Sequence, residues 1–338
     1  MKSLLVFVSI LLGAAAMAAP PAGGYHLLKR IPVPGEGGWD YLIVDESARR
    51  LYISHATKVD VIDIESEAAV GTIPAQGVHG IAFATDLGRG FVSNGQSAAV
   101  TIFDLKTLHV VGAVETGKNP DAIIYDPATK RVFAFNGASS NATVIEAANG
   151  KVAGTIEVGG KPEFAVADGA GRVFVNVEDK NEVLRIDSRK LAIMDRWPMA
   201  GCEEPSGLTM DRESRRLFSG CGNRVMAVTN ADTGRAVATV LIGQGVDATS
   251  FDPGTNLVFN SNGDGTLTVV HEDSPESYRV VENVQTQRGA RTMALDPKTH
   301  KVFLSVAQLG PRPAPTPEQP RPRPSIVPGT FTILVLGR

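Results

Sequence analysis

The sequence predicts an all-β protein, a seven-bladed β-propeller whose blades each contain four strands. Three observations support this fold class. A unit of about 42 residues recurs seven times, each unit contains several short β-branched segments, and the two ends of the chain each carry an incomplete unit. Seven copies of such a unit are typical of a propeller, because each blade buries its faces only against its neighbours.

The opening segments of the units establish the repeat. Two examples are GVHGIAFATDLGRGFVSN (77–94) and NPDAIIYDPATKRVFAFN (119–136). Aligned in this way, the equivalent residues lie at steps of 39, 42, 42, 43, 41 and 44; they are Asp40, His79, Asp121, Glu163, Ser206, Asp247 and Arg291. A chain of 338 residues often forms two domains. The unbroken repeat predicts instead a single domain over residues 20–338.

Each unit divides into four short strands. In the third unit the first two strands cover 122–125 and 131–135, and in the second unit the last two cover 100–103 and 110–114. β-Branched and aromatic residues fill these segments, and Gly, Asn, Asp and Pro separate them. In six units an Asp follows the aligned position by five residues; these are Asp45, Asp126, Asp168, Asp211, Asp252 and Asp296. We expect each to bond the backbone of the turn between the first and second strands.

The ends of the chain predict how the ring closes. Residues 25–33 resemble a fourth strand without its first three, whereas 289–336 supply three strands without a fourth. We therefore expect the N-terminal strand to complete the seventh blade, which removes an open sheet edge. A Pro-rich segment, 310–328, replaces the link between the second and third strands of that blade. It should lie on the top face, at the channel mouth, as a lid, a rim or a solvated insertion.

The second strands carry a recurring pattern, shown by Phe91-Val92-Ser93-Asn94. Together with the preceding short strand and turn Asp, this pattern resembles the YVTN-repeat (YncE-like) propeller family over essentially the whole mature chain. The resemblance implies a seven-bladed propeller and says little about activity. Some units depart from the pattern and lack its Asn; they have His55, Val177, Cys221 and Val306 there.

The N-terminal segment and the net charge indicate location and partners. Residues 1–19 contain Lys2, an apolar run over 4–12 and a small-residue stretch, which predict a cleaved Sec-type signal peptide. We expect a periplasmic or secreted monomer without a membrane span. The net charge of −3 gives no electrostatic reason for nucleic acid as the main partner.

The two cysteines, Cys202 and Cys221, lie before the first strand and after the second strand of the fifth unit. A hairpin that turns near 212–215 places them close to opposite one another. In an exported chain we interpret them as a disulfide, worth about 3 kcal/mol in the chain-entropy model. The alternative is a pair of thiolate metal ligands.

Loops that enter first strands and leave second strands share one propeller face, so two residue sets should converge there. The candidate metal ligands are Asp40, His55, His79, Asp121, Glu163 and Asp247. The candidate ligand-binding residues are Trp39, Asn94, Asn136, Asn176, Glu204, Asn262, Arg288 and Arg291. Two carboxylates 4 Å apart cost about 4 kcal/mol at an effective dielectric of 20, which a cation, an arginine or raised pKa values must relieve. The same side chains could instead cap neighbouring loops and hold ordered water.

Three functions remain open at this stage. The favoured hypothesis is a periplasmic binding propeller for a small ligand or one divalent metal ion. The second is a metal-dependent lactonase or lyase with His79 and Glu163 as catalytic residues. The third is a scaffold for a periplasmic protein partner. The sequence has no P-loop, CxxCH or Trp-rich propeller pattern, so we expect no nucleotide, haem or quinone cofactor.

Overall fold

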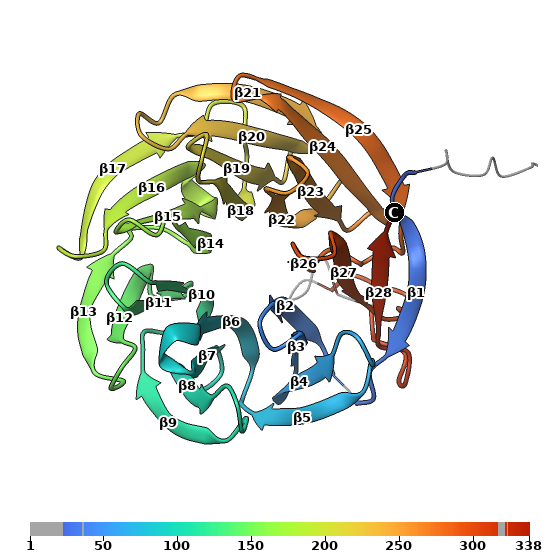
Figure 1. Cartoon of the computed structure of the whole chain (residues 1–338), viewed down its shortest axis with the longest axis horizontal. Helices are drawn as coiled ribbons and strands as arrows, with labels where there is room; N and C mark the ends of the chain where they lie inside the picture. The colour runs from blue at the N-terminus through green and yellow to red at the C-terminus, as the bar shows by residue number, and fades with distance from the viewer. Residues whose placement is uncertain (1–22, 36, 317–321, 323) are drawn as a thin grey trace, which may run out of the picture.

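Seven four-stranded antiparallel sheets surround a central channel in the computed structural model (Figure 1). The structure describes residues 23–35, 37–316, 322 and 324–338. The prediction of an all-β, seven-bladed propeller is confirmed. The predicted signal peptide, 1–19, lies outside the described residues, as do 317–321 and 323 of the Pro-rich segment.

The strands follow the order expected from the repeat. Blades one to three contain β2 (Trp39–Asp45), β3 (Arg50–His55), β4 (Lys58–Asp63), β5 (Ala69–Pro74); β6 (Val78–Ala84), β7 (Arg89–Asn94), β8 (Ala99–Asp104), β9 (Val110–Glu115); and β10 (Pro120–Asp126), β11 (Arg131–Asn136), β12 (Asn141–Glu146), β13 (Val152–Glu157). Blades four and five contain β14 (Pro162–Ala167), β15 (Arg172–Val177), β16 (Glu182–Asp187), β17 (Ala192–Pro198); and β18 (Pro205–Asp211), β19 (Arg216–Cys221), β20 (Val225–Asn230), β21 (Ala236–Leu241). Blades six and seven contain β22 (Val246–Asp252), β23 (Leu257–Asn262), β24 (Thr266–Ser274), β25 (Ser277–Gln285); and β26 (Met293–Asp296), β27 (Lys301–Val306), β28 (Thr332–Gly337), β1 (His26–Pro32). Two 3₁₀ turns, η1 (Thr85–Leu87) and η2 (Glu178–Lys180), separate strands in blades two and four.

In the part of the chain that the structure describes, no helix is both long and apolar enough to cross a membrane.

The hydrophobic core lies between the blades. Second and third strands are buried on both faces because each blade is packed between two others; Leu51, Tyr52 and Ile53 of β3, for example, are fully buried. Fourth strands form the outer edge and bury fewer residues, so Val70 of β5 is exposed while Ile73 is buried. Apolar burial between neighbouring blades therefore stabilises the ring and leaves the channel for polar residues.

The N-terminal strand closes the ring, as the incomplete units predicted. β1 pairs antiparallel with β28, from His26 opposite Gly337 to Pro32 opposite Thr332. Just before β1, the Tyr25 ring packs on Phe259 of blade six, with 5.0 Å between the ring centroids.

The aspartates that begin the turns between first and second strands bond the turn backbone, as expected. Asp45 Oδ1, for example, accepts hydrogen bonds from the backbone N–H groups of Ser47 and Ala48, each at 3.0 Å. Some of these carboxylates also join neighbouring blades, which the repeat did not indicate. Asp252 of blade six lies 2.7 Å from Nδ1 of His300 in blade seven.

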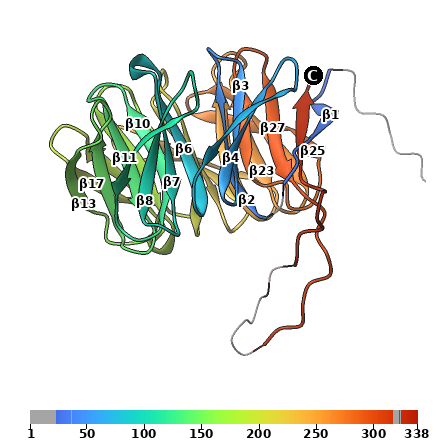
Figure 2. The same ribbon diagram turned by 90° about the horizontal axis from the view of Figure 1, so that it is seen from below.

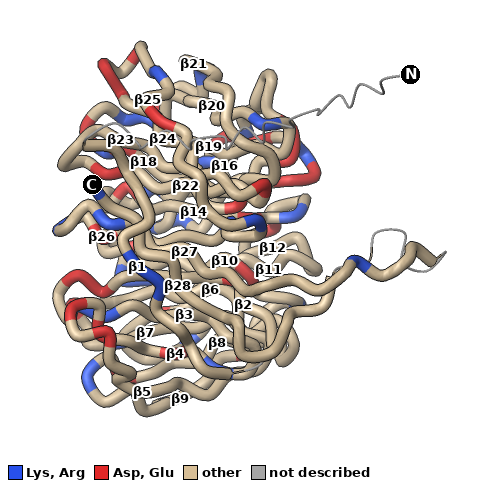
Figure 3. The backbone as a smooth tube through the Cα atoms, turned by 90° about the vertical axis from the view of Figure 1, so that its right-hand side faces the viewer, with Lys and Arg blue, Asp and Glu red and all other residues tan. Residues whose placement is uncertain are grey.

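The Pro-rich segment begins and ends beside the first blade. Leu309 and Ile326 pair across its base, and the Phe331 ring stacks on Trp39 with 5.1 Å between the ring centroids. Because Trp39 begins a first strand, the base lies at the face where the first strands enter. The described parts of the loop stand out from the ring instead of lying flat against it (Figures 2 and 3).

Candidate functional site

A cavity of about 520 Å³ occupies the mouth of the central channel. All seven residues that the sequence alignment made equivalent line it, namely Asp40, His79, Asp121, Glu163, Ser206, Asp247 and Arg291. The seven aligned residues therefore surround the channel mouth as predicted, with one residue from each repeat.

A β-bulge at the start of the first strands explains why the aligned side chains of blades one to six reach the channel, whereas Arg291 of blade seven lies before β26. In β2, Trp39 pairs with His55, and the next paired residue is Leu42, opposite Ile53. Asp40 therefore has no paired residue on β3. The same irregularity recurs in the first strands of blades two to six. A bulge re-aims the side chain beside it, and here it turns the aligned residue inward.

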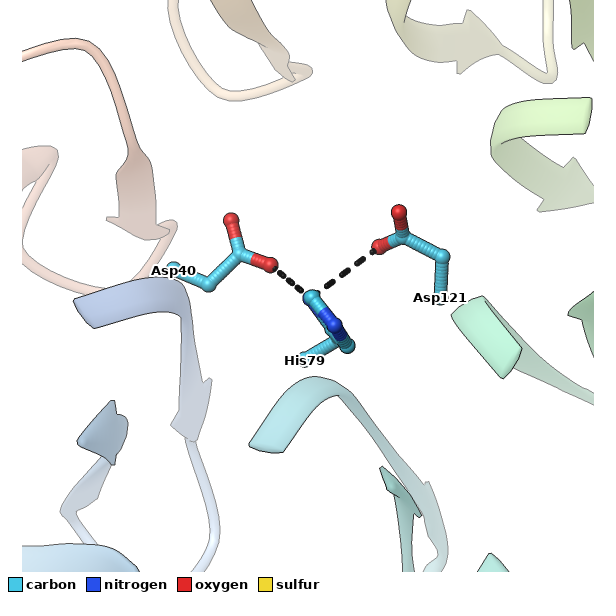
Figure 4. Close-up of side chains that lie close together, drawn as sticks. All are labelled: Asp40, His79 and Asp121. Carbon is cyan, nitrogen blue, oxygen red and sulfur yellow. Dashed lines mark hydrogen bonds and ion pairs between the residues drawn. The ribbon is translucent and has the colours of Figure 1, made fainter. Parts of the chain in front are cut away.

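The closest group of potential ligand atoms comes from the first three blades (Figure 4). His79 Nδ1 lies 2.5 Å from Asp40 Oδ2 and 3.7 Å from Asp121 Oδ1. One ligand atom from each residue lies within 4.8 Å of the others. All three side chains are partly exposed to the cavity. Two carboxylates and an imidazole thus converge on one point, and we refer to them as the Asp40–His79–Asp121 triad.

Electrostatics in the triad favour a positive charge. The hydrogen bond with Asp40, followed by the Asp121 charge, raises the pKa of His79. Burial, together with repulsion by Asp40, raises the pKa of Asp121 to about 6. His79 and Asp121 therefore hold protons more tightly than isolated side chains do, and the shift of His79 indicates that positive charge is favourable between the two carboxylates.

The opposite side of the cavity contains further buried carboxylates. Burial raises the pKa of Glu163 to about 8 even though Lys161 Nζ lies 2.6 Å from its carboxylate and opposes the shift. Lys161 also contacts Glu178. Burial likewise raises the pKa of Asp247 to about 6, because Arg291, 3.7 Å away, opposes it only in part.

Two aromatic rings form the floor of the cavity, and the sequence reasoning missed them. Tyr41 of blade one stacks on Phe164 of blade four, with 5.4 Å between ring centroids and 25° between ring planes. Both rings also line a deeper cavity of about 260 Å³ whose other residues come from farther along the first strands. The pair therefore separates the two spaces. A signal existed, because the residue after the aligned position is small in the other five units; these are Gly80, Ala122, Gly207, Ala248 and Thr292.

The predicted residues at the ends of second strands do not line this cavity. His55 is buried, with Nδ1 2.8 Å from Asp60 and its ring against Phe331. Asparagines hold the second strands to the third strands; Asn94 donates to Thr101, Asn136 to Thr143 and Asn262 to Thr268. Asn176 instead donates to the backbone oxygen of Ser206 at 2.9 Å. The physical reason is that these side chains bond within and between the sheets, while the bulged starts of the first strands turn their side chains toward the channel.

The remaining predicted residues divide as follows. Trp39 and Glu204 line the cavity, while Arg288 is exposed and is not among the residues that line it.

The disulfide prediction is confirmed, because Cys202 and Cys221 are bonded with their Cα atoms 5.4 Å apart. The alternative of a thiolate metal site is therefore wrong.

Comparison with known proteins supports the fold class. No protein-family model and no curated protein sequence matches this chain. Among solved structures, a chain of the mitotic checkpoint complex is 13% identical, covering 97% of this chain and all of that chain, with a TM-score of 0.74. A chain of Kuenenia stuttgartiensis hydrazine synthase is 14% identical over 80% of this chain and 94% of that chain, with a TM-score of 0.68. The structure of U3-55K is 10% identical, covering 92% of this chain and 99% of that chain, with a TM-score of 0.74. This protein is thus a seven-bladed β-propeller; at these identities the likeness shows the fold alone.

Proposed function

We propose that this protein is an exported binding propeller of the YVTN-repeat type, in which the Asp40–His79–Asp121 triad binds one divalent cation. The carrying observation is the convergence of three ligand atoms within 4.8 Å at a cavity mouth. Mixed oxygen and nitrogen ligands suit several divalent metals, including zinc and manganese. A bound cation would also offset the repulsion between Asp40 and Asp121.

Two further features support export. The Cys202–Cys221 disulfide is the kind of bond that persists in oxidising compartments such as the periplasm. The segment 1–19 has the composition of a cleaved signal. Mass spectrometry of the protein from the periplasmic fraction tests this point, and a mature N-terminus near Ala18 is the expected result. Full-length protein retained in the cytoplasm would contradict it.

The cation proposal is tested by elemental mass spectrometry of mature protein purified without chelator. We expect about one equivalent of one divalent metal per chain, as three converging ligands define a single site. Asp40→Asn and Asp121→Asn should each lose it. Glu157→Gln, which changes an exposed acid on β13, is the matched control and should retain it.

Thermal melts verify that the variants fold, and calorimetric titration with zinc and with manganese repeats the comparison at equilibrium. Equal metal content in all four proteins, or failure of the wild type to bind either metal, would exclude the triad as a cation site.

A second candidate function is a metal-dependent lactonase or lyase that uses the same cavity. The observation in its favour is the pKa of about 8 at Glu163, which keeps this carboxyl protonated at neutral pH and available as a proton donor. Turnover of a panel of lactones and cyclic esters by metal-loaded protein tests it. Glu163→Gln should then abolish turnover while metal content stays unchanged. No turnover across the panel would reject the enzyme hypothesis and leave the binding function intact.

A further inference from the structure

The cavity is much larger than one metal ion requires. Its volume of about 520 Å³ lies within the usual range of roughly 300–1,000 Å³ for small-molecule sites. The triad comes from blades one to three (β2, β6 and β10), so it accounts for one side. The strands of blades four to six lie across the channel from it (Figure 1).

The charges on this second side define the kind of molecule that fits. Its lining includes the carboxylates Glu163, Glu178, Glu204 and Asp247 and the basic side chains Lys161 and Arg291. A divalent ion at the triad would offset Asp40 and Asp121. Even with the protonated Glu163 left out, this side would keep three carboxylates against two basic groups. A ligand placed here is therefore favoured when it carries positive charge.

Asp247 is a cavity-lining carboxylate whose ion pair is long. Its side chain is 15% exposed, and its contact with Arg291 is long, at 3.7 Å, with the Arg291 side chain 48% exposed. Ser206 Oγ adds a hydrogen bond at 3.4 Å. By comparison, Glu163 and Glu178 share the ammonium group of Lys161. Asp247 thus faces the cavity with a weakly held counter-charge.

The aromatic floor distinguishes an organic cation from a hydrated inorganic ion. Tyr41 and Phe164 present a stacked ring pair to the cavity, and Trp39 lines it as well. The faces of such rings attract ammonium groups, and their apolar surface favours carbon attached to the nitrogen.

We propose that the cavity binds a small organic ammonium compound, with its nitrogen between the Tyr41–Phe164 ring pair and Asp247. This inference deepens the proposed binding function, since it names a second ligand class for the same cavity. It does not require the metal, because Asp247, Tyr41 and Phe164 lie outside the triad. The carboxylate selects for charge, the aromatic pair favours the carbon attached to the nitrogen, and the cavity volume limits size.

Isothermal titration calorimetry with choline, putrescine and spermidine tests the proposal. The matched probe is 3,3-dimethyl-1-butanol, which has the shape of choline without its charge. We expect at least one of the three amines to bind, and the neutral alcohol to bind at least about ten-fold more weakly than choline, since it loses both the ring and the carboxylate attraction. Fluorescence of Trp39 should change on binding.

Phe164→Leu should weaken amine binding about ten-fold by removing one ring of the floor. Phe251→Leu is the matched control, because Phe251 stacks on Phe218 and lines the deeper cavity instead. It should bind the amine as the wild type does. Equal loss in both variants would mean that the effect is general destabilisation, and would overturn the role of the ring pair.

The triad variant Asp40→Asn separates this proposal from the metal proposal. If amines bind to the wild type and to Asp40→Asn while the metal is lost, both proposals hold. If the wild type binds metal but none of the three amines at millimolar concentrations, this inference fails and the metal site stands. Equal binding of choline and its neutral isostere would also overturn it. Amine binding without any metal binding would reject only the cation site.

Discussion

Arg49, in the turn that follows the first strand of blade one, donates two hydrogen bonds to the buried carboxylate of Asp296 in blade seven. The distances are 2.9 Å from Nη1 and 2.7 Å from Nη2. This bidentate pair joins the first blade to the last at the far end of the channel from the cavity. It therefore supports ring closure in addition to the β1–β28 pairing.

Arg49→Met should lower the free energy of unfolding by about 3 kcal/mol, because it leaves the buried Asp296 carboxylate without its partner. Denaturant unfolding followed by circular dichroism measures the change. The double variant Arg49→Met/Asp296→Asn should recover part of the loss, as it removes the unpaired charge. A single variant as stable as the wild type would show that closure does not depend on this pair.

The same pair predicts a pH dependence. Burial acts to raise the pKa of Asp296, but the hydrogen bonds from Arg49 and Thr299 outweigh it and hold this pKa below its ordinary value. The stabilisation is therefore present above about pH 4, the unfolded value, and is lost as the pH falls through the lower folded value. The difference in stability between wild type and Arg49→Met should shrink on acidification. A difference that stays constant from pH 7 to pH 3 would contradict this account.

Asp247→Asn should have the opposite effect on stability. Burial raises the pKa of Asp247 to about 6, so the folded state binds this proton more tightly than the unfolded state. The folded protein consequently loses stability as the pH rises from about 4 through 6. The substitution should raise the free energy of unfolding by about 1–2 kcal/mol at pH 7.5 and leave it nearly unchanged at pH 4.

Urea unfolding at the two pH values measures the Asp247 effect. The exposed control, Glu157→Gln, should leave the free energy of unfolding unchanged at both pH values. If Asp247→Asn destabilises the protein at pH 7.5, the Arg291 and Ser206 contacts matter more than the burial of the charge.

Gly207→Ala should destabilise the ring by about 2 kcal/mol. A Cβ atom at this position would lie 2.5 Å from the backbone nitrogen of Thr249 and 2.7 Å from the carbonyl oxygen of Asp247, so neighbouring first strands would have to separate. Thermal unfolding measures the loss. Gly112→Ala is the matched control, since a Cβ atom there meets nothing within 4 Å. Equal melting temperatures for the two variants would show that the strands can move apart freely.

Removing the disulfide with Cys202→Ser/Cys221→Ser should lower the free energy of unfolding by about 3 kcal/mol, because the bond closes a loop with a sequence separation of 19. Denaturant unfolding with and without reductant checks this. The reductant should shift the wild type toward the variant and leave the variant unchanged. An unaffected wild type, with the bond shown to be reduced, would mean that the disulfide adds little stability.

The fold was predictable because the repeats recur at nearly constant spacing along the chain. Equivalent residues such as Asp40 and Asp121 must then occupy equivalent positions around the ring. The seven aligned residues of the cavity lining followed from the same alignment. His55 and Asn136 were misplaced because sharing a face does not mean sharing a cavity; their side chains bond within the sheets. Tyr41 and Phe164 were missed since their role depends on a contact across the channel, which spacing along the chain does not reveal.

The pairing of β1 with β28 has a consequence for assembly. His26 lies opposite Gly337, so the seventh blade needs strands from both ends of the chain. During synthesis, β1 emerges first and must wait for β28, which emerges last, whereas blades one to six can form in order behind it. We therefore expect β1 to be the segment most vulnerable to proteases in a nascent chain. Once β28 pairs with β1, the seventh blade is complete and the ring of blades closes.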